Sequence, residues 1–519
     1  IKKQTGVQFD LFSQIEENNE DKSELKNHFS NQTIIHNKED LNNFKKQLSF
    51  HQTISFQSIV NNENNNVVCF SCDGKNTFFL KENNKEITIK IIKNFMQELF
   101  VFDIEKICYD IKNFWNTIGV NFDYIVNPNM FDLMLAAYIS NPDERNNHEI
   151  LIKRMLNVDL YVDQKNYQCK DEYLSNLVTL NFKLKEEQLK SLDSSNTLDV
   201  FKEIEMPLTF ILFKMEKEGF SLNQEAMSIF SKKLKSEIAT IKGNVFSISG
   251  KEFNIASPKQ LGEILFLDLN LDKNAKKTKT GQFSTSEQNL QRLKHTHPII
   301  DLVLKYRSLE KLFSTYVEAL PNLINKKTNK IHTTFNQAVA ATGRLSSKEP
   351  NLQNIPIRTK YGREIRRAFT PSNGNILLAA DYSQIELRLI AEFSSEPTMT
   401  QAFLEDKDIH SMTASKLFNL PFENITREMR SNAKTVNFGI IYGVSAFGLS
   451  QQTNLNRKES AALINTYFEK YHKLKVYMNN QIAFARENGY VETILGRRRY
   501  LKDINSRNSL LRSHAERNA

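Results

Sequence analysis

The stretch "RSNAKTVNFGIIYG" at residues 430–443 places two cations and two aromatic side chains four residues apart: Arg430, Lys434, Phe438 and Tyr442. A four-residue step turns only about 40° around an α-helix, so we predict that these side chains share one face. Two neighbouring cations suit a triphosphate, and the rings beyond them can stack a sugar and a base. The alternative is a helix with a basic end and an aromatic core end.

A second candidate is Asp381, which follows the apolar run "NILLAA" at 375–380 and precedes a helical pattern containing Ile385 and Leu389. A buried strand that ends on a carboxylate before an amphipathic helix places a metal ligand at the edge of an α/β sheet. The pattern therefore predicts a buried strand, a ligand and a helix. For a single Asp in this place, capping the helix N-terminus is the commoner role.

Two further segments have the composition of a nucleic-acid contact. The segment 342–356, "TGRLSSKEPNLQNIP", is rich in side chains that hydrogen-bond phosphate, sugar and minor-groove acceptors. The segment 489–508, "GYVETILGRRRYLKDINSRN", predicts a hairpin with three consecutive arginines. A polar loop and a solubilising surface are the respective alternatives.

The elements that position these residues follow a mixed α/β region. Residues 1–30 are polar and acid-rich, which indicates a linker. Strand-like segments surround the asparagine run at 61–66, which we expect to be a hairpin loop, and the pattern from about 90 to 200 is helical. Residues 31–200 therefore predict a mixed α/β first domain.

A long helical region follows from 204 to about 325. The lysine-rich segment 271–288, "LDKNAKKTKTGQFSTSEQ", interrupts it and ends in a Ser or Thr N-cap before Glu287. Such a loop is either a solvated tip or a contact for a phosphate backbone. Short strands and turns follow residue 330, and helices resume at about 383.

Length and composition limit the classes of protein to which this chain can belong. The 519 residues exceed one hydrophobic core, and the formal charge of +9 is compatible with a polyanionic partner. Four cysteines do not form a disulfide framework, and we expect Cys69 and Cys72 to be buried thiols rather than a zinc or redox pair. No apolar run reaches the ~20 residues of a membrane span, which predicts a cytoplasmic protein without membrane contact. The chain begins with Ile1 rather than Met, so we expect a fragment.

Five segments in order resemble the family A DNA polymerases, of the bacterial polymerase I type: "TGRLSSKEPNLQNIP", "DYSQIELRLIA", "DIHSMTA", "RSNAKTVNFGIIYG" and "GRRRYLKDI". The similarity covers about 204–519 and extends more weakly towards residue 30. It implies an α/β multidomain fold: a ribonuclease-H-like domain of the 3′-5′ exonuclease type, then a right-hand polymerase domain truncated at the C-terminus. The implied ranges are a linker at 1–30, the exonuclease-like domain at 31–200 and the polymerase domain at 201–519, with thumb 206–325, palm 330–420, fingers 421–505 and the start of the return to the palm at 506–519.

The resemblance implies template-directed addition of deoxynucleotides to a primer 3′-hydroxyl, in DNA replication and repair. Asp381 and the carbonyl of Tyr382 would bind two Mg²⁺ ions, while Arg430, Lys434 and His410 would bind the triphosphate and Lys434 would be the acid for the leaving pyrophosphate. Glu386 would exclude a 2′-hydroxyl, and Phe438 would disfavour dideoxynucleotides. The nucleotide-binding set is Tyr382, Gln384, Glu386, His410, Arg430, Lys434, Phe438 and Tyr442, and the set that tracks primer and template is Thr342, Arg344, Asn351, Gln353, Asn354, Tyr442, Gly443 and Arg517.

Two departures from the family pattern qualify this expectation. The exonuclease of the family needs four carboxylates, but "FQSIV" offers Gln57 and Ile59 for the first two, and Ser175 or Asn176 stands for the last. Only Asp110 matches, so we expect no proofreading, because one carboxylate cannot hold two magnesium ions. The chain also contains no His-Asp-Glu motif for the second palm Asp. We therefore expect the 519-residue segment alone to be inactive, although the resemblance implies that the parent protein is a polymerase.

Two other functions remain open at this stage. A single-subunit RNA polymerase shares the Asp and the Arg/Lys/Tyr helix, although Glu386 and Phe438 argue against it. A non-catalytic protein that binds duplex DNA fits the eroded exonuclease acids, although Asp381, Arg430 and Lys434 are intact. The expected partners are primer-template DNA and deoxynucleoside triphosphates, and the expected state is a monomer.

Overall fold

The computed structural model describes residues 31–60, 66–83, 85–120, 129–144, 146–160, 169–294, 296–357, 359–453 and 455–519. The predicted linker at 1–30 and the loop residues 61–65 lie outside this set. The chain divides into two compact units: residues 1–210, 340–343 and 381–519 form unit 1, and residues 211–339 and 344–380 form unit 2. Each unit is described by itself.

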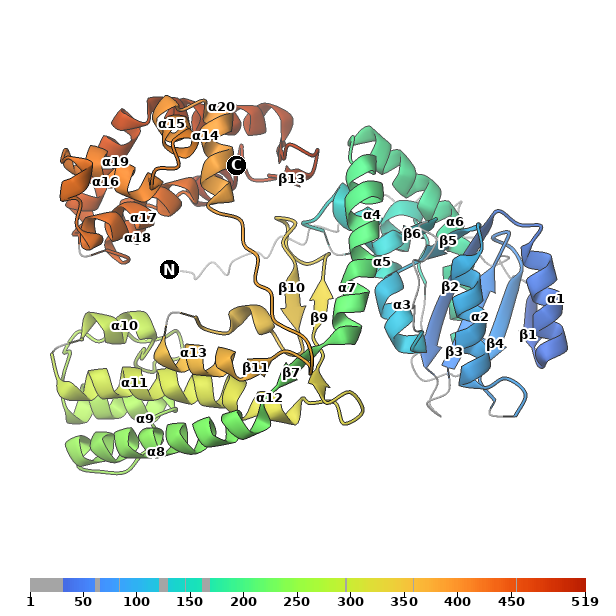
Figure 1. Ribbon diagram of the computed structural model, residues 1–519, viewed down its shortest axis with the longest axis horizontal. Helices are drawn as coiled ribbons and strands as arrows, with labels where there is room; N and C mark the ends of the chain where they lie inside the picture. Colours follow the sequence, from blue (N-terminus) through green and yellow to red (C-terminus); the bar gives the residue numbers. More distant parts are fainter. Residues whose placement is uncertain are drawn as a thin grey trace, which may run out of the picture. The chain divides into compact units, whose positions relative to one another are not determined.

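Unit 1 begins with a six-stranded mixed sheet in the order β1-β4-β3-β2-β5-β6 (Figure 1). The predicted hairpin is confirmed, because β2 and β3 on either side of the asparagine run pair antiparallel, whereas β2, β5 and β6 run parallel. We call this sheet and its helices the sheet domain. Its strands are β1 Gln32–Ile35, β2 Thr53–Val60, β3 Asn66–Ser71, β4 Thr77–Lys81, β5 Glu105–Cys108 and β6 Met130–Asp132, and its helices are α1 Lys38–Leu48, α2 Ile89–Val101, α3 Ile111–Ile118, α4 Leu133–Ser140, α5 His148–Leu156 and α6 Cys169–Ser194.

Side chains alternate between the two faces of the sheet along β2 and β3, and the two faces pack against different residues. Phe56 and Phe70 are opposite each other in the strand pair and pack against phenylalanines of α1, α2 and α3. Ser55 points the other way, where it accepts a hydrogen bond from Asn181 of α6. Helices therefore cover both faces of the sheet, which confirms a mixed α/β organisation.

The expectation of purely helical structure from 90 to 200 is wrong at two places. β5 and β6 lie inside this range and extend the sheet by parallel pairing. Both strands are three or four residues long, so their apolar pattern is too short to distinguish a strand from a helical turn.

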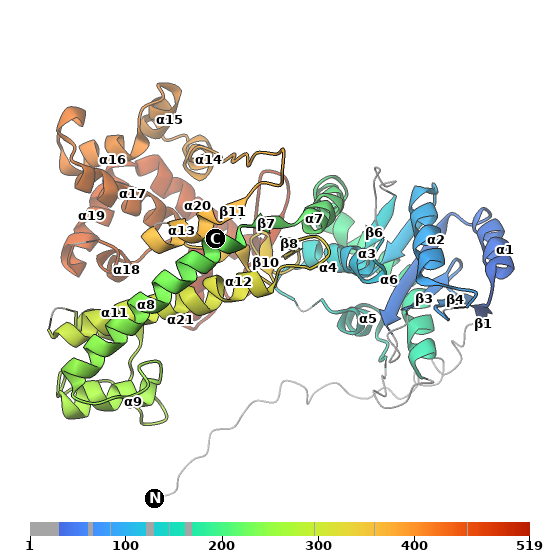
Figure 2. The same cartoon turned by 60° about the horizontal axis from the view of Figure 1, so that its bottom comes forward.

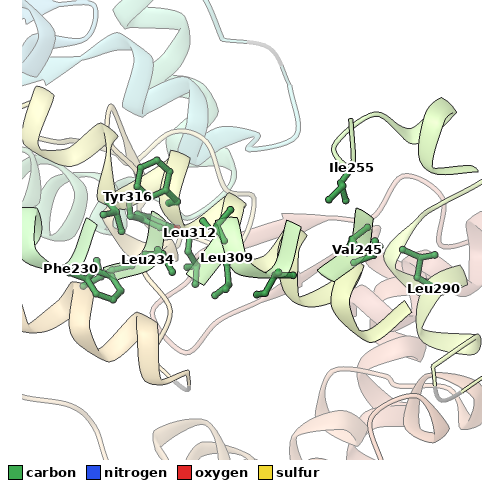
Figure 3. Close-up of a cluster of buried hydrophobic side chains, with 14 of the residues drawn as sticks. Phe230, Leu234, Val245, Ile255, Leu290, Leu309, Leu312 and Tyr316 are labelled. Atoms are coloured by element: carbon green, nitrogen blue, oxygen red, sulfur yellow. The ribbon is translucent and has the colours of Figure 1, made fainter. Parts of the chain in front are cut away.

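Unit 2 contains two long antiparallel helices, α8 Gln224–Ser249 and α11 Pro298–Leu312, which lie side by side in both views (Figure 2). Their apolar faces form one core that includes Leu234, Leu309 and Tyr316 (Figure 3). The predicted helical region is confirmed, except that β7 Phe220–Leu222 interrupts it after α7 Met206–Glu218. The remaining elements of unit 2 are α9 Pro258–Glu263, η3 Ile264–Asp268, α10 Glu287–Arg292, η4 Phe313–Val317, α12 Ala319–Asn322, β8 Lys330–Ile331, β9 Thr334–Asn336, β10 Ser346–Lys348, η5 Leu352–Asn354, α13 Lys360–Arg367 and β11 Phe369–Thr370.

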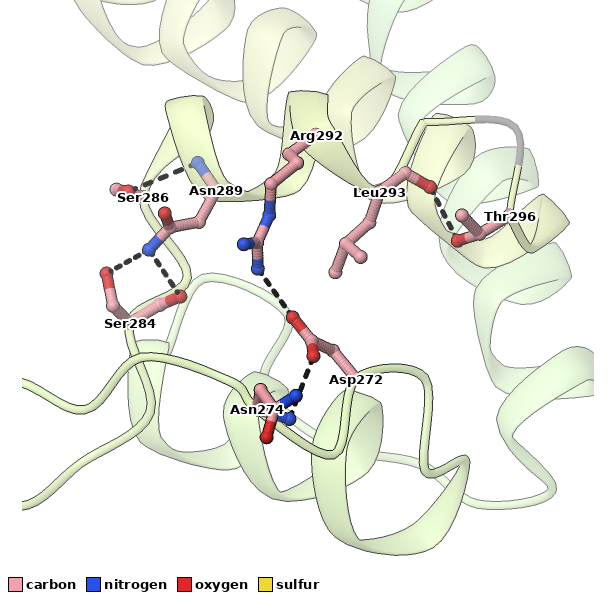
Figure 4. Close-up of polar contacts among 8 residues, drawn as sticks. All are labelled: Asp272, Asn274, Ser284, Ser286, Asn289, Arg292, Leu293 and Thr296. Atoms are coloured by element: carbon pink, nitrogen blue, oxygen red, sulfur yellow. Dashed lines mark hydrogen bonds and ion pairs between the residues drawn. The ribbon is translucent and has the colours of Figure 1, made fainter.

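The lysine-rich loop is tied to α10 by polar contacts (Figure 4). Ser286 is the N-cap of α10, as the sequence predicts, and accepts from the backbone N–H of Asn289. The Asn289 side chain donates to Ser284, and Arg292 forms an ion pair with Asp272. These contacts fix both ends of the loop, while Lys276 and Lys279 are exposed.

The apolar run 375–380 is not the buried strand that its composition predicts. It has no assigned strand pairing, and Ile376 and Leu378 are 85% and 87% exposed. A strand needs a neighbour that accepts its backbone hydrogen bonds, and the described residues provide none for this segment.

The rest of unit 1 is mostly helical and has its own core, which includes Leu387, Val436 and Tyr467. The predicted helix after Asp381 exists as α14, but its buried apolar residues are Leu387 and Ala391, whereas Ile385 and Leu389 are about two-fifths exposed. The elements are η2 Val200–Glu205, α14 Ile385–Ser394, α15 Pro397–Leu404, α16 Ile409–Phe418, η6 Phe422–Asn424, α17 Arg427–Ile441, α18 Ala446–Ser450, α19 Arg457–Lys470, α20 His472–Asn488, β12 Tyr490–Glu492, β13 Arg498–Tyr500 and α21 Ser509–Asn518. Among the described residues, no helix combines the length and the hydropathy needed to cross a bilayer.

Candidate functional site

Helix α17 carries the predicted stripe. Thr426 caps its N-terminus by accepting from the backbone N–H of Met429, and the helix ends at Ile441. Arg430 and Lys434 are exposed and Phe438 is half-buried, while Tyr442 is the C-cap residue and 52% exposed. The basic end of the stripe is therefore exposed, whereas at its aromatic end Phe438 packs against the neighbouring core and Tyr442 is exposed.

The opposite face of α17 is buried and packs the helix against the rest of unit 1. Ala433, Val436, Asn437 and Ile440 are the buried positions, and α17 packs mainly on α16. Burying apolar side chains at three- and four-residue spacing leaves the stripe facing outward. The sequence therefore separates a packing face from an exposed face on one helix.

Arg430 is fixed by an ion pair between its Nε and the Oδ2 of Asp408. Asp408 also caps α16, accepting from the backbone N–H of His410 at 3.0 Å and from the Ser411 hydroxyl at 2.8 Å. Burial opposes the charge on Asp408, but hydrogen bonds from Arg430, Ser411 and His410 hold its pKa below the ordinary value. Asp408 therefore orients the guanidinium and leaves its remaining N–H groups for a ligand.

His410 is buried beside the stripe, with its ring centroid 5.7 Å from that of Phe438. The side-chain amide of Asn437 donates to its Nδ1 at 3.0 Å, which leaves the proton on Nε2. Burial, opposed by the charge of Asp408 and aided by those of Arg430 and Lys434, lowers the pKa of His410 to about 4. The ring is therefore a neutral hydrogen-bond donor at neutral pH.

The other end of the stripe is closed by a contact between Tyr442 and Glu386 of α14. The Tyr442 hydroxyl donates to the Oε2 of Glu386. Gly443 follows with φ +66°, and a Cβ there would lie 2.3 Å from the Cγ of Arg517. Glycine is required at this position both by the left-handed backbone and by the close approach of Arg517.

Asp381 and Tyr382 lie in an exposed, extended segment before α14, and Tyr382 is 79% exposed. Asp381 is not the helix N-cap, because Gln384 occupies that position. The Oε1 of Gln384 is buried, and no hydrogen-bond partner for it exists among the described residues. Of the two roles weighed for Asp381, capping is therefore excluded.

The predicted DNA-tracking residues fall into two groups. In unit 1, Thr342, Gly443 and Arg517 line one cavity of about 520 Å³ together with Arg497. In unit 2, an exposed turn carries Arg344, Asn351, Gln353 and Asn354. Within this turn the Gln353 amide donates to the carbonyl of Leu345, and the Tyr316 hydroxyl donates to the carbonyl of Asn354.

The sheet domain does not assemble the four acids of an exonuclease. Gln57 on β2 faces β5, where its amide donates to the carbonyl of Tyr109 and its Oε1 accepts from the Tyr109 N–H. Ser175 of α6 is buried and hydrogen-bonds Thr77 of β4 and Gln32 of β1. In the described residues no group of three or more His, Cys, Asp or Glu side chains could hold a metal ion.

Sequence reasoning missed a second acid beside Asp110. Asp132 ends β6 and is buried, and its carboxylate accepts from the backbone N–H groups of Asp110, Ile111, Met134 and Leu135. Burial, followed by the charge of Asp110, raises its pKa to about 7 against these donors. An Asp at the end of a short apolar run and before a helix is the signal that could have found it.

Asn437 and Asp408 were missed as well, although both lie inside quoted motifs. Their positions in the sequence could have identified them. Asp408 is two residues before His410, and Asn437 is adjacent to Phe438 on the buried side of α17. The cysteine prediction is confirmed, since Cys69 and Cys72 are free and buried. Burial raises the pKa of Cys72 to about 12, which keeps it a thiol.

Comparisons with known proteins show which family the chain resembles. The model of DNA polymerase family A matches residues 224–519. A DNA polymerase I of Caldicellulosiruptor bescii is 40% identical over 447 residues, covering 86% of this chain and 51% of the relative, and one of Bacillus subtilis is 38% identical, covering 84% and 50%. The solved polymerase domain of Pol1 from M. smegmatis, in complex with DNA primer-template and dNTP, superposes with a TM-score of 0.81 at 29% identity, covering 94% of this chain and 84% of that one. The chain spans about half the length of these curated relatives.

Proposed function

Because the chain belongs to DNA polymerase family A, we propose that it carries the nucleotide- and DNA-binding parts of a template-directed DNA polymerase of the bacterial polymerase I type. The observation that carries this proposal is the open face of α17, with Arg430 and Lys434 at one end and Phe438 and Tyr442 at the other. The proposed reaction joins a deoxynucleotide to a primer 3′-hydroxyl and releases pyrophosphate, in DNA replication and repair.

The α17 face binds and orients the nucleotide in this proposal. Arg430, held by Asp408, and Lys434 neutralise the triphosphate, and the Nε2–H of His410 adds a donor without a charge. Donors whose positions are fixed before the ligand arrives stabilise charge that develops during phosphoryl transfer. We assign Lys434 to donate the proton to the leaving pyrophosphate.

Selection of the sugar is assigned to Glu386 and Phe438. The hydroxyl of Tyr442 holds the Glu386 carboxylate in one position. A fixed acid beneath the sugar would clash with a 2′-hydroxyl, whereas a mobile one would move aside. This contact favours a DNA polymerase over the single-subunit RNA polymerase considered from the sequence.

Proteins of this family generally use divalent metal ions, and Mg²⁺ is the ion we propose, because carboxylate and phosphate oxygens are the ligands it prefers. The described residues do not fit two such ions. Asp381 is the single carboxylate assigned to them, and it lies in an exposed segment. We therefore do not expect these residues alone to support extension of a primer.

For the sheet domain we propose a ribonuclease-H-like, 3′-5′ exonuclease-type ancestry without proofreading activity. Residues 31–200 would form this domain and 201–519 the polymerase domain, with the thumb, palm and fingers as predicted above. The support is the replacement of acids by Gln57 and Ser175, both engaged in structural hydrogen bonds. The proposed partners are primer-template DNA and deoxynucleoside triphosphates, bound by a cytoplasmic monomer.

Steady-state primer extension by the full-length protein tests the proposal. Lys434→Ala and Arg430→Ala should each lower kcat/KM for dNTP by about 10- to 100-fold, because each loses a charge-assisted hydrogen bond. Lys458→Ala is the matched control, since Lys458 is an exposed lysine on α19 outside the stripe, and should stay within about two-fold. Equal rates for all three variants, or rNTPs used as well as dNTPs, would contradict the proposal.

A further inference from the structure

The turn at residues 340–343 is locked by a side chain of the sheet domain. Tyr138 of α4 is buried, and its hydroxyl donates to the carbonyl of Ala340 at 2.7 Å. The same carbonyl accepts the backbone N–H of Gly343 at 3.0 Å, which closes the turn. One carbonyl therefore joins the sheet domain to the backbone that carries Thr342.

Arg497 secures the other side of this turn. It ends the loop of the β12–β13 hairpin, where its N–H donates to the Thr493 hydroxyl. Its guanidinium forms an ion pair with Glu205, and both side chains are largely buried. The guanidinium carbon lies 5.9 Å from the centre of the Tyr138 ring, and a Cβ on Gly343 would be only 2.9 Å from the Arg497 Nε.

These contacts end at the wall of the proposed DNA site. Ala341, Thr342 and Arg497 line the cavity of about 520 Å³ that also contains Gly443 and Arg517. Glu205 neutralises the buried guanidinium of Arg497. We therefore assign Arg497 to stabilising the turn at 340–343 rather than to binding phosphate. The hydrogen bond from Tyr138 thus fixes the turn that carries Thr342, and the ion pair with Glu205 fixes Arg497. Thr342 and Arg497 both line the cavity.

We propose that Tyr138 is a positioning residue for primer-template binding, acting through the turn at 340–343, and that this is a present role of the sheet domain in polymerisation. The inference rests on the proposed function above. It assigns a task to a domain whose described residues hold no metal-binding cluster. The sheet domain would raise affinity for DNA by keeping Thr342 in place before DNA arrives.

Tyr138→Phe in the full-length protein is the direct test, because it removes one hydroxyl and keeps the ring under Arg497. The dissociation constant for a fluorescent primer-template should rise about 3- to 10-fold, the effect of one lost buried hydrogen bond. The KM for DNA should rise in parallel, while kcat at saturating DNA and the KM for dNTP stay at wild-type values. This split distinguishes positioning from a general loss of folded protein.

Two companion variants make the result specific. Tyr109→Phe is the matched control, since its hydroxyl donates to the carbonyl of Asn146 within the same sheet domain and away from the cavity. It should leave DNA affinity unchanged. Thr342→Ala combined with Tyr138→Phe should weaken binding by less than the product of the single effects, because both act through one turn.

Wild-type DNA affinity in Tyr138→Phe, equal loss in Tyr109→Phe, or fully multiplicative effects in the double variant would each overturn the inference. The proposed function would stand after any of these results, provided that the wild-type protein extends primers. Failure of the wild-type protein to extend any primer would instead overturn the proposed function.

Discussion

His410 should remain neutral throughout the pH range in which a free histidine titrates. Its ring is 2% exposed and its Nδ1 accepts from Asn437. Burial, opposed by Asp408 and aided by Arg430 and Lys434, lowers its pKa to about 4. The ordinary value is about 6.5. The structure thus predicts a downward shift of about 2.5 pH units.

The sign of the effect on stability follows from proton uptake. Between pH 6.5 and 4 the unfolded chain binds a proton at His410 that the folded chain does not bind. Stability from this group is therefore complete above pH 6.5 and is lost as the pH falls towards 4. At about 1.4 kcal/mol per unit, the full loss is about 3 kcal/mol, with a slope of about 1 kcal/mol per pH unit near pH 5.

NMR of ring-labelled histidine in the full-length protein measures this directly, and the spectrum of His410→Gln assigns the signal. His148, whose pKa burial lowers to about 4 against its hydrogen bond with Asn181, serves as a second low-titrating reference in the sheet domain. A His410 midpoint near 6.5 would refute the reasoning, because it would mean that the ring is solvated. Asn437→Asp should move the midpoint upward, since a carboxylate at 3.0 Å from Nδ1 favours the imidazolium.

Three further outcomes are expected. Glu386→Ala should narrow the preference for dNTP over rNTP by at least about ten-fold, measured as the ratio of kcat/KM values, because it removes the acid that Tyr442 holds. Phe438→Tyr should increase incorporation of dideoxynucleotides in a competition assay, since the added hydroxyl replaces the missing 3′-OH. A mismatched primer end should not be excised by the wild-type protein, and Asp110→Ala should leave the rate at background, because Gln57 and Ser175 replace two of the needed acids.

The face of α17 that carries the stripe could be predicted from the sequence because its geometry is local. Four-residue spacing from Arg430 to Tyr442 fixes one face of a helix regardless of what lies elsewhere. The same holds for Ser286, whose capping depends only on the next few residues. The contacts that tune this face could not be predicted, since Asp408, Asn437 and Glu386 reach it from other turns or other helices.

The contacts of Asp132 and Tyr138 could not be predicted either, because they join residues that are far apart in the sequence. Asp132 meets Asp110 because β5 and β6 pair in parallel, with Cys108 opposite Asp132. Tyr138 meets Ala340 across 202 residues of sequence. Neither approach leaves a periodic pattern, because each depends on which elements become neighbours in the folded chain.

The apolar run at 375–380 shows that strand propensity is not sufficient for strand formation. Its composition favours a strand, but no residue from 375 to 380 is assigned to one. Burial and ladder hydrogen bonds are supplied by neighbouring strands, and the described residues pair none with it. The same reasoning applies to Asp381 directly after it: the run places this carboxylate at its end, but only a paired sheet would bring it beside further metal ligands. Residue type and spacing therefore predict Asp381 as a ligand, while completion of a metal site would depend on strand pairing that the run cannot provide by itself.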